Sequence, residues 1–170
     1  MTTHKRRERS VSAPSIDIII DSPVWDSVPS AKSALRRAIA AAAPRHTRNA
    51  ELAIVLTDDQ SIRSLNRQWR GHDSATNVLS FPAPAPDRRQ GTPMALGDIV
   101  IAYETTAKEA AAEGKSFLHH LSHLAVHGFL HLVGYDHESH DDAETMEGLE
   151  RRILARLGMP DPYAARDAKP

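Results

Sequence analysis

The fold is decided by one stretch of the chain, 116–134, which has the sequence SFLHHLSHLAVHGFLHLVG. Ser116 has a side chain that favours an N-cap, and Gly134 stands where a left-handed residue ends a helix. We therefore predict one helix from Ser116 to about Val133. Seven of the ten histidines in the chain lie on this helix or just after it. A function for the chain has to explain this concentration of imidazole.

Outside this helix, short apolar runs alternate with helical patterns. Short runs of β-branched and apolar residues predict four strands, over 15–21, 51–56, 78–81 and 96–103. Helical spacing predicts four further helices, over 29–43, 57–69, 105–113 and 140–157. We expect Thr57 at an N-cap, because Gln60 three residues later completes a capping-box pattern. This order predicts an α+β fold, a single layered domain in which a mixed sheet of about four strands packs with about five helices.

The length of 170 residues fits one domain, which we place at 15–163. The preceding segment, 1–14, holds four basic residues and lacks the apolar run of a secretory signal, so we expect a disordered basic tail. The alternative is an arm that contacts nucleic acid. Residues 164–170 are expected to form a short C-terminal tail. No apolar run approaches the roughly 20 residues that cross a bilayer, so we expect no membrane contact.

The composition limits the chemistry of the site. The chain has no cysteine, which excludes disulfides, thiolate-bound zinc, iron–sulfur clusters and a cysteine nucleophile. Any metal site must therefore use histidine, aspartate or glutamate. With 21 Lys and Arg against 22 Asp and Glu, the chain is nearly neutral. This balance argues against a uniformly basic nucleic-acid binder but leaves room for a local basic patch.

Helical spacing places four histidines on one face of the predicted helix. At about 100° per residue, His120, His123 and His131 all lie within about 40° of His127. His127 and His131 are four residues apart, about 6 Å along the axis, so both rings can reach one ion. His120 and His123 lie one or two turns upstream. We expect them to support the site from behind or to form a satisfied polar face, rather than to bind metal.

A third ligand is available just beyond the helix. Gly134 can turn the chain back and bring His137 to the ion that His127 and His131 hold. Three histidines leave one position of a zinc ion open for water or substrate, as in catalytic sites. The spacing matches the histidine and glycine skeleton of the metzincin zinc proteases. However, Gly128 stands where those proteases carry their glutamate base, which argues against a peptidase.

Three blocks of the sequence resemble the YbeY family of bacterial endoribonucleases. HGFLHLVGYDH at 127–137 is similar to the family signature, and LNRQWRGHDSATNVLSFP at 65–82 and LGDI at 96–99 are similar to its other hallmarks. Order and spacing agree from about 16 to 163. Trp69 stands where the family more often has tyrosine, a change that we expect to be tolerated.

The resemblance implies a single-strand-specific, metal-dependent endoribonuclease that acts in ribosomal RNA maturation and ribosome quality control. Its location would be the bacterial cytoplasm, and its partners single-stranded RNA, above all ribosomal RNA, and the ribosome or its proteins. It implies that His127, His131 and His137 bind one metal ion per chain, with His127 and Arg70 as catalytic residues. Zinc suits this ligand set, and nickel or another imidazole-binding ion is the alternative.

Three arginines are spaced to line one face of the helix predicted over 57–69 and its end. Arg63, Arg67 and Arg70 form either a local basic stripe or an ordinary solvated face. Arg70 differs from the other two because a polar turn follows it, from which a side chain can reach a cleft. It matches the arginine that the family requires, and a guanidinium can bind two phosphate oxygens and offset charge in phosphodiester cleavage.

Three aspartates are secondary candidates. Asp73 is expected to hold the loop after Arg70 or the arginine itself. Asp98 is expected either at a partner surface or in a structural role. Asp136 either orients the neighbouring His137 or simply forms a turn.

Neither the attacking group nor the general base is assigned by these residues. Water activated at the metal and the 2′-hydroxyl of the RNA are both compatible with them. Two other classes of protein also fit the histidines: a zinc hydrolase of another substrate, and a ribosome-associated assembly factor whose metal is mainly structural.

Overall fold

The computed structural model describes residues 13–85 and 92–168. Its elements are, in chain order, β1 (Ser15–Ile20), η1 (Pro23–Ser27), α1 (Ala31–Ala42), η2 (Arg45–Thr47), β2 (Ala50–Thr57), α2 (Asp59–Arg70), β3 (Val78–Pro82), β4 (Met94–Ala102), α3 (Tyr103–Ala112), α4 (Phe117–Leu132), α5 (His140–Arg156) and α6 (Ala164–Asp167). The basic tail expected over 1–14 lies, up to residue 12, outside the described residues.

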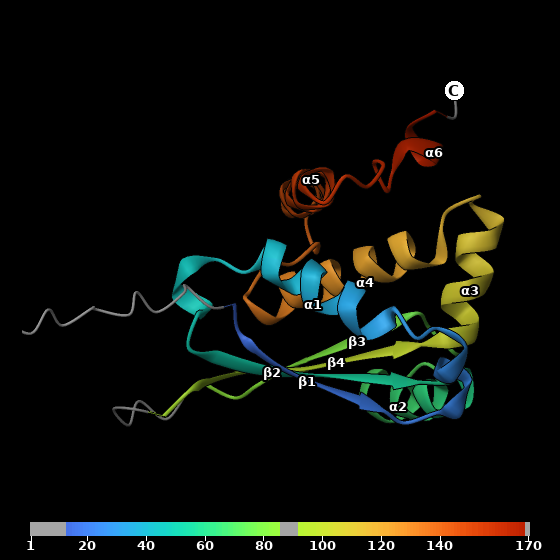
Figure 1. The fold of residues 1–170 in the computed structure, drawn as a ribbon, viewed down its shortest axis with the longest axis horizontal. Helices are drawn as coiled ribbons and strands as arrows, with labels where there is room; N and C mark the ends of the chain where they lie inside the picture. The colour runs from blue at the N-terminus through green and yellow to red at the C-terminus, as the bar shows by residue number, and fades with distance from the viewer. Residues whose placement is uncertain (1–12, 86–91, 169–170) are drawn as a thin grey trace, which may run out of the picture.

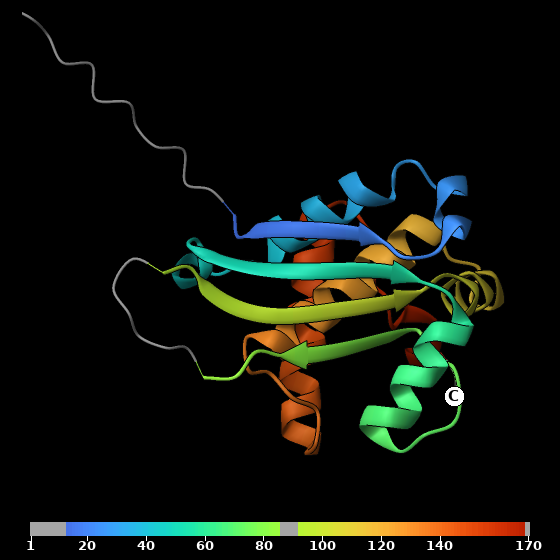
Figure 2. The ribbon, with the colours of Figure 1, turned by 90° about the horizontal axis from the view of Figure 1, so that it is seen from below.

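The four strands form one mixed sheet in the order β1-β2-β4-β3. β1, β2 and β4 run parallel, and β3 pairs antiparallel with β4. Figure 2 shows the sheet with β1 and β3 at its two edges. The predicted α+β class with a mixed four-stranded sheet is confirmed. The described residues contain six α-helices rather than five, because the four-residue α6 forms where only a tail was expected.

The helices lie in layers on both sides of the sheet. α1 and α4 cover one face with α5 outside them, and α2 covers the other face (Figure 1). Within residues 13–85 and 92–168, no helix combines the length and apolar character needed to cross a membrane.

α4 is the central helix because it is apolar on nearly all sides, which is typical of a buried helix. Leu121, Ala125, Val126 and Phe129 are completely buried. Gly128 allows the close approach of α4 to the sheet, because a β-carbon there would lie 3.0 Å from Cγ2 of Ile99 on β4. The buried core thus fixes the helix that carries most of the histidines.

The start of α2 differs from the prediction. Thr57 is not the N-cap: it is the last residue of β2, and its hydroxyl donates a 2.7 Å hydrogen bond to the carboxylate of Asp21. Asp58 caps the helix instead, accepting a 2.9 Å hydrogen bond from the backbone N–H of Ser61. The strand therefore runs one residue further than its apolar pattern, and the stronger acceptor takes the N-cap position.

Candidate functional site

Three histidines meet at the C-terminal end of α4. Nitrogen atoms of His127, His131 and His137 all lie within 4.8 Å of one another. The Nε2 atoms of His127 and His131 are 3.2 Å apart. Two zinc–nitrogen bonds of about 2.0–2.1 Å at a tetrahedral angle would separate the nitrogens by about 3.3 Å, so this pair suits a shared ion. The donor set and its spacing therefore fit a metal.

A tight turn brings the third histidine back to the other two. Gly134 has a φ of 100°, and its N–H donates to the carbonyl of His131. The N–H of Tyr135 donates to the carbonyl of Leu130. This pair of bonds is the Schellman arrangement, which satisfies the last carbonyls of α4. It places the ring of His137 with its centroid 5.0 Å from that of His131.

A buried glutamate holds the first histidine. Nδ1 of His127 lies 2.7 Å from Oε1 of Glu150 on α5, whose side chain is fully buried. A proton on Nδ1 that is donated to Glu150 leaves the lone pair of Nε2 facing His131. The other carboxylate oxygen of Glu150 accepts from Nε2 of His123 at 2.8 Å and from the hydroxyl of Tyr163.

Sequence reasoning missed Glu150, although its position carries a signal. On α5 the neighbouring buried positions Met146, Ile153 and Leu154 are apolar, so a glutamate on the same stripe is out of place. Such a residue needs a buried partner. The histidines of α4 supply that partner.

The surroundings set the charges of these groups. Burial would raise the pKa of Glu150, but the hydrogen bonds from His123 and His127 outweigh it and lower the pKa to about 2. Glu150 is therefore a carboxylate at neutral pH. Burial lowers the pKa of His131, and the neighbouring His127 and His137 lower it further. His131 is thereby held as neutral imidazole, the form that binds metal.

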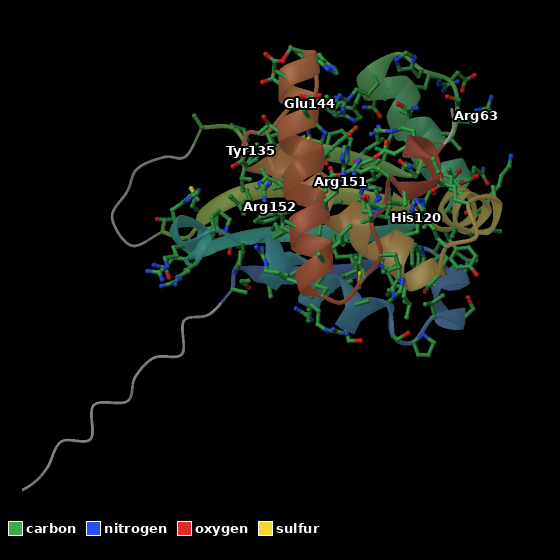
Figure 3. All side chains as sticks on the ribbon, turned by 90° about the horizontal axis from the view of Figure 1, so that it is seen from above. Arg63, His120, Tyr135, Glu144, Arg151 and Arg152 are labelled. Carbon is green, nitrogen blue, oxygen red and sulfur yellow. The ribbon has the colours of Figure 1, made fainter. Side chains whose placement is uncertain are left out.

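The two upstream histidines do not join the metal-ligand group. Nε2 of His120 lies 2.7 Å from a carboxylate oxygen of Glu109 on α3, and only 5% of His120 is exposed. His123 contacts the same carboxylate of Glu150 that holds His127, and its ring lies edge-on to that of His127 with 6.4 Å between the centroids. His120 and Tyr135 lie toward opposite ends of α4 (Figure 3).

The predicted arginine lies at the same cleft as the histidines. Arg70 ends α2, and its Nη2 donates a 2.9 Å hydrogen bond to the carbonyl of Ser80 on β3. Its guanidinium carbon is 5.3 Å from the ring centroid of Phe81. Arg70 and the three histidines line one cleft of about 560 Å³, which runs along β3 and is also bordered by Tyr135. Residues far apart in the sequence are thus brought to one place.

The remaining candidates have other partners. Asp73 accepts hydrogen bonds of 2.8 and 3.1 Å from Arg63 and so holds the loop after α2, not Arg70. Arg63 is therefore paired within the chain, which leaves Arg67 and Arg70 of the expected stripe. The side chain of Asp136 accepts from the backbone N–H of His137 and not from its ring.

Asp98 lies away from the histidine cleft. On β4 the next residue, Ile99, packs against Gly128 of α4, so Asp98 points to the opposite face of the sheet. There it borders a shallow groove together with Asp17 and Glu51.

Comparison with known proteins gives consistent matches over most of the chain. Residues 24–158 match the family model described as Endoribonuclease YbeY. Endoribonuclease YbeY of Rhodopseudomonas palustris strain BisB5 is 56% identical over 167 residues, which cover 93% of this chain and 86% of that protein. Its namesake in Bradyrhizobium diazoefficiens is 52% identical over 169 residues, covering 94% and 92%. A solution structure of a Thermotoga maritima protein covers 91% of this chain and 97% of its own, at 23% identity and a TM-score of 0.49.

Proposed function

This chain belongs to the YbeY family of endoribonucleases, and on that premise we propose that it is a zinc-dependent endoribonuclease that cuts single-stranded RNA. The observation that carries the proposal is the meeting of Arg70 and three histidines in one cleft. A phosphodiester needs both a cationic donor for its oxygens and a group that activates it. Arg70 and a metal ion held by the histidines would offer them.

The histidines are proposed to hold the metal. His127, His131 and His137 would bind one ion, and a bound ion would supply Lewis-acid polarisation of the phosphodiester. Neutral imidazoles without cysteine favour zinc among the common ions. Glu150 supports this role because it fixes the proton of His127 on Nδ1.

Arg70 is proposed to stabilise the charge that develops on the phosphoryl oxygens. Its hydrogen bond to the Ser80 carbonyl and its place over Phe81 hold the guanidinium at the cleft. A guanidinium has five N–H donors, so donors remain for two phosphate oxygens after the bond to Ser80. Either water or the 2′-hydroxyl of the RNA attacks, and products that end in a 2′,3′-cyclic phosphate would identify the 2′-hydroxyl.

A peptidase fits this cleft less well. The β-carbon of any side chain at position 128 would lie 3.0 Å from Cγ2 of Ile99 and 3.1 Å from Oγ of Ser80. A glutamate base of the protease type beside His127 would therefore require these neighbouring side chains to shift.

We further propose ribosomal RNA as the substrate, with the ribosome as the partner and the bacterial cytoplasm as the place of action. The support for this part is the resemblance of blocks 65–82 and 127–137 to the family hallmarks.

The deciding experiment compares the purified wild-type chain with His127→Ala and Arg70→Ala on single-stranded and duplex RNA, with and without chelator. We expect zinc at about one per chain, and cleavage of the single strand that is lost in both variants and on chelation. Circular dichroism checks that both variants are folded. If wild type and Arg70→Ala leave RNA equally uncut while chelation only unfolds the protein, the metal is structural and the assembly-factor alternative holds.

A further inference from the structure

Of the exposed aromatic residues, one lines the cleft and one lies next to it. Among the described residues, four large hydrophobic side chains are exposed: Ile19, Ile20, Trp69 and Tyr135. The isoleucines lie on β1 at one edge of the sheet. The two aromatic residues lie instead by β3, at the other edge, where the cleft runs. Exposed aromatic surface has a free-energy cost in water, so its restriction to the rim of a candidate active site calls for a ligand.

Trp69 lies on α2 directly before Arg70, next to the cleft but not among the residues that line it. It is 59% exposed, whereas the other tryptophan, Trp25, is 2% exposed and donates to the carbonyl of Thr57. The ring of Trp69 packs edge-on against Phe81, with 6.1 Å between the centroids. The guanidinium of Arg70 also lies over the ring of Phe81. One edge of Trp69 is thus anchored beside the arginine while most of the ring stays in water.

Tyr135 lies on the side of the cleft formed by α4. It directly follows Gly134, and its backbone N–H is tied to Leu130, so the turn that places His137 also places this ring. Its side chain lines the cleft, and the residue is 40% exposed. In the view of Figure 3 it and Arg63 of α2 are seen on opposite sides of α5. One accessible aromatic ring therefore adjoins Arg70 on α2, and another lines the cleft with the histidines in the turn after α4.

We propose that Trp69 and Tyr135 each stack on an unpaired base of the RNA, one on either side of the phosphate to be cut. The inference rests on the proposed function and assigns its preference for single strands to these two rings. Unpaired bases can be splayed onto aromatic side chains, whereas the bases of a duplex are already paired and stacked. Aromatic stacking next to a cationic group is the common way in which proteins bind single strands without reading the sequence.

Cleavage kinetics test the proposal with the metal-loaded protein. Trp69→Ala and Tyr135→Ala are expected to raise KM for single-stranded RNA about tenfold, the usual order for the loss of one stacked base, with a smaller change in kcat. Trp69→Phe keeps a ring and should recover most of the affinity. Ile19→Ala is the matched control, because it truncates an exposed apolar residue at the opposite edge of the sheet. It should leave KM unchanged.

Fluorescence gives a readout that does not depend on cleavage. Trp69 is the exposed one of two tryptophans, so a base stacked on it should quench the emission of the wild type and not that of Trp69→Phe. Oligouridylate and an abasic oligomer of the same length are mixed rapidly with the protein. Quenching by oligouridylate alone supports stacking.

Three outcomes separate this inference from the proposed function. An unchanged KM in both alanine variants, or equal quenching by the abasic oligomer, overturns base stacking while the nuclease stands. If the wild type cuts no RNA, the proposed function fails. In that case base-dependent quenching still supports RNA binding by Trp69, and its absence overturns that too.

Discussion

The two halves of α4 carry the same residue type in different settings. In the N-terminal half, Nε2 of His120 is hydrogen-bonded to the carboxylate of Glu109, and Nε2 of His123 is hydrogen-bonded to that of Glu150. In the C-terminal half, the Nε2 atoms of His127 and His131 lie 3.2 Å apart, and both residues line the cleft. Helical spacing alone therefore does not make a metal site. The position of the carboxylates decides which imidazole nitrogens remain available.

The largest effect is expected in the C-terminal half of α4, where His127 and His131 line the cleft. His131→Ala removes one of three proposed ligands, and since loss of an outer partner of a ligand already costs about 10–100-fold, we expect cleavage to fall by more than about 100-fold. Zinc content should fall with it, as measured by elemental analysis. His140→Ala is the control, because that imidazole is exposed and pairs only with Glu144. Full zinc occupancy in His131→Ala would remove His131 from the ligand set.

The next largest effect is expected at Glu150, whose carboxylate contacts one histidine from each half of α4. Glu150→Gln keeps the size of the side chain but removes the charge that His127 and His123 share. We expect zinc affinity to fall about 10–100-fold, measured by competition with a chromophoric chelator. Glu147→Gln is the control, since Glu147 lies on the same helix and pairs with Arg166 instead. Equal affinities in the two variants would mean that Glu150 does not position His127.

In the N-terminal half of α4 we expect a substitution to lower the stability of the protein without loss of metal. His120→Ala removes a buried partner of Glu109, which should lower the free energy of unfolding by about 1–3 kcal/mol in urea denaturation. Zinc stoichiometry should stay at the wild-type value. A fall in stoichiometry under native conditions would contradict the division of α4 into two halves.

The smallest effect is expected at Tyr163, whose hydroxyl donates the third hydrogen bond to the carboxylate of Glu150. Tyr163→Phe removes this donor while His123 and His127 remain, so we expect a loss of about 1 kcal/mol in thermal or urea denaturation. Tyr135→Phe removes an exposed hydroxyl and should be neutral. If the two variants are equally stable, the hydrogen bond from Tyr163 contributes nothing measurable.

Local patterns predicted the framework of this fold well. The four strands, the long histidine-bearing helix and the left-handed Gly134 all follow from periodicity and from turn residues. The start of α5 is also local, since the hydroxyl of Ser139 caps the helix by accepting from the N–H of Asp142. These features depend on residues that are close in the sequence.

Distant partners could not be predicted in the same way. Helical phase placed His120, His123 and His127 on one face, but Glu109 and Glu150 come from α3 and α5. Only the packing of three helices shows which imidazole meets which carboxylate. The N-cap of α2 was wrong by one residue for a related reason, because Thr57 is held in the sheet by Asp21.

The close approach of α4 to the sheet at Gly128 also limits which residues can replace this glycine beside the histidines. The histidine spacing resembles that of zinc proteases, yet one substitution cannot convert one chemistry into the other. A β-carbon at position 128 would lie 3.0 Å from Cγ2 of Ile99 and 3.1 Å from Oγ of Ser80, so a glutamate there requires those side chains or the helix to shift. The residues packed around position 128, and not only the residue at that position, therefore separate the two enzyme classes.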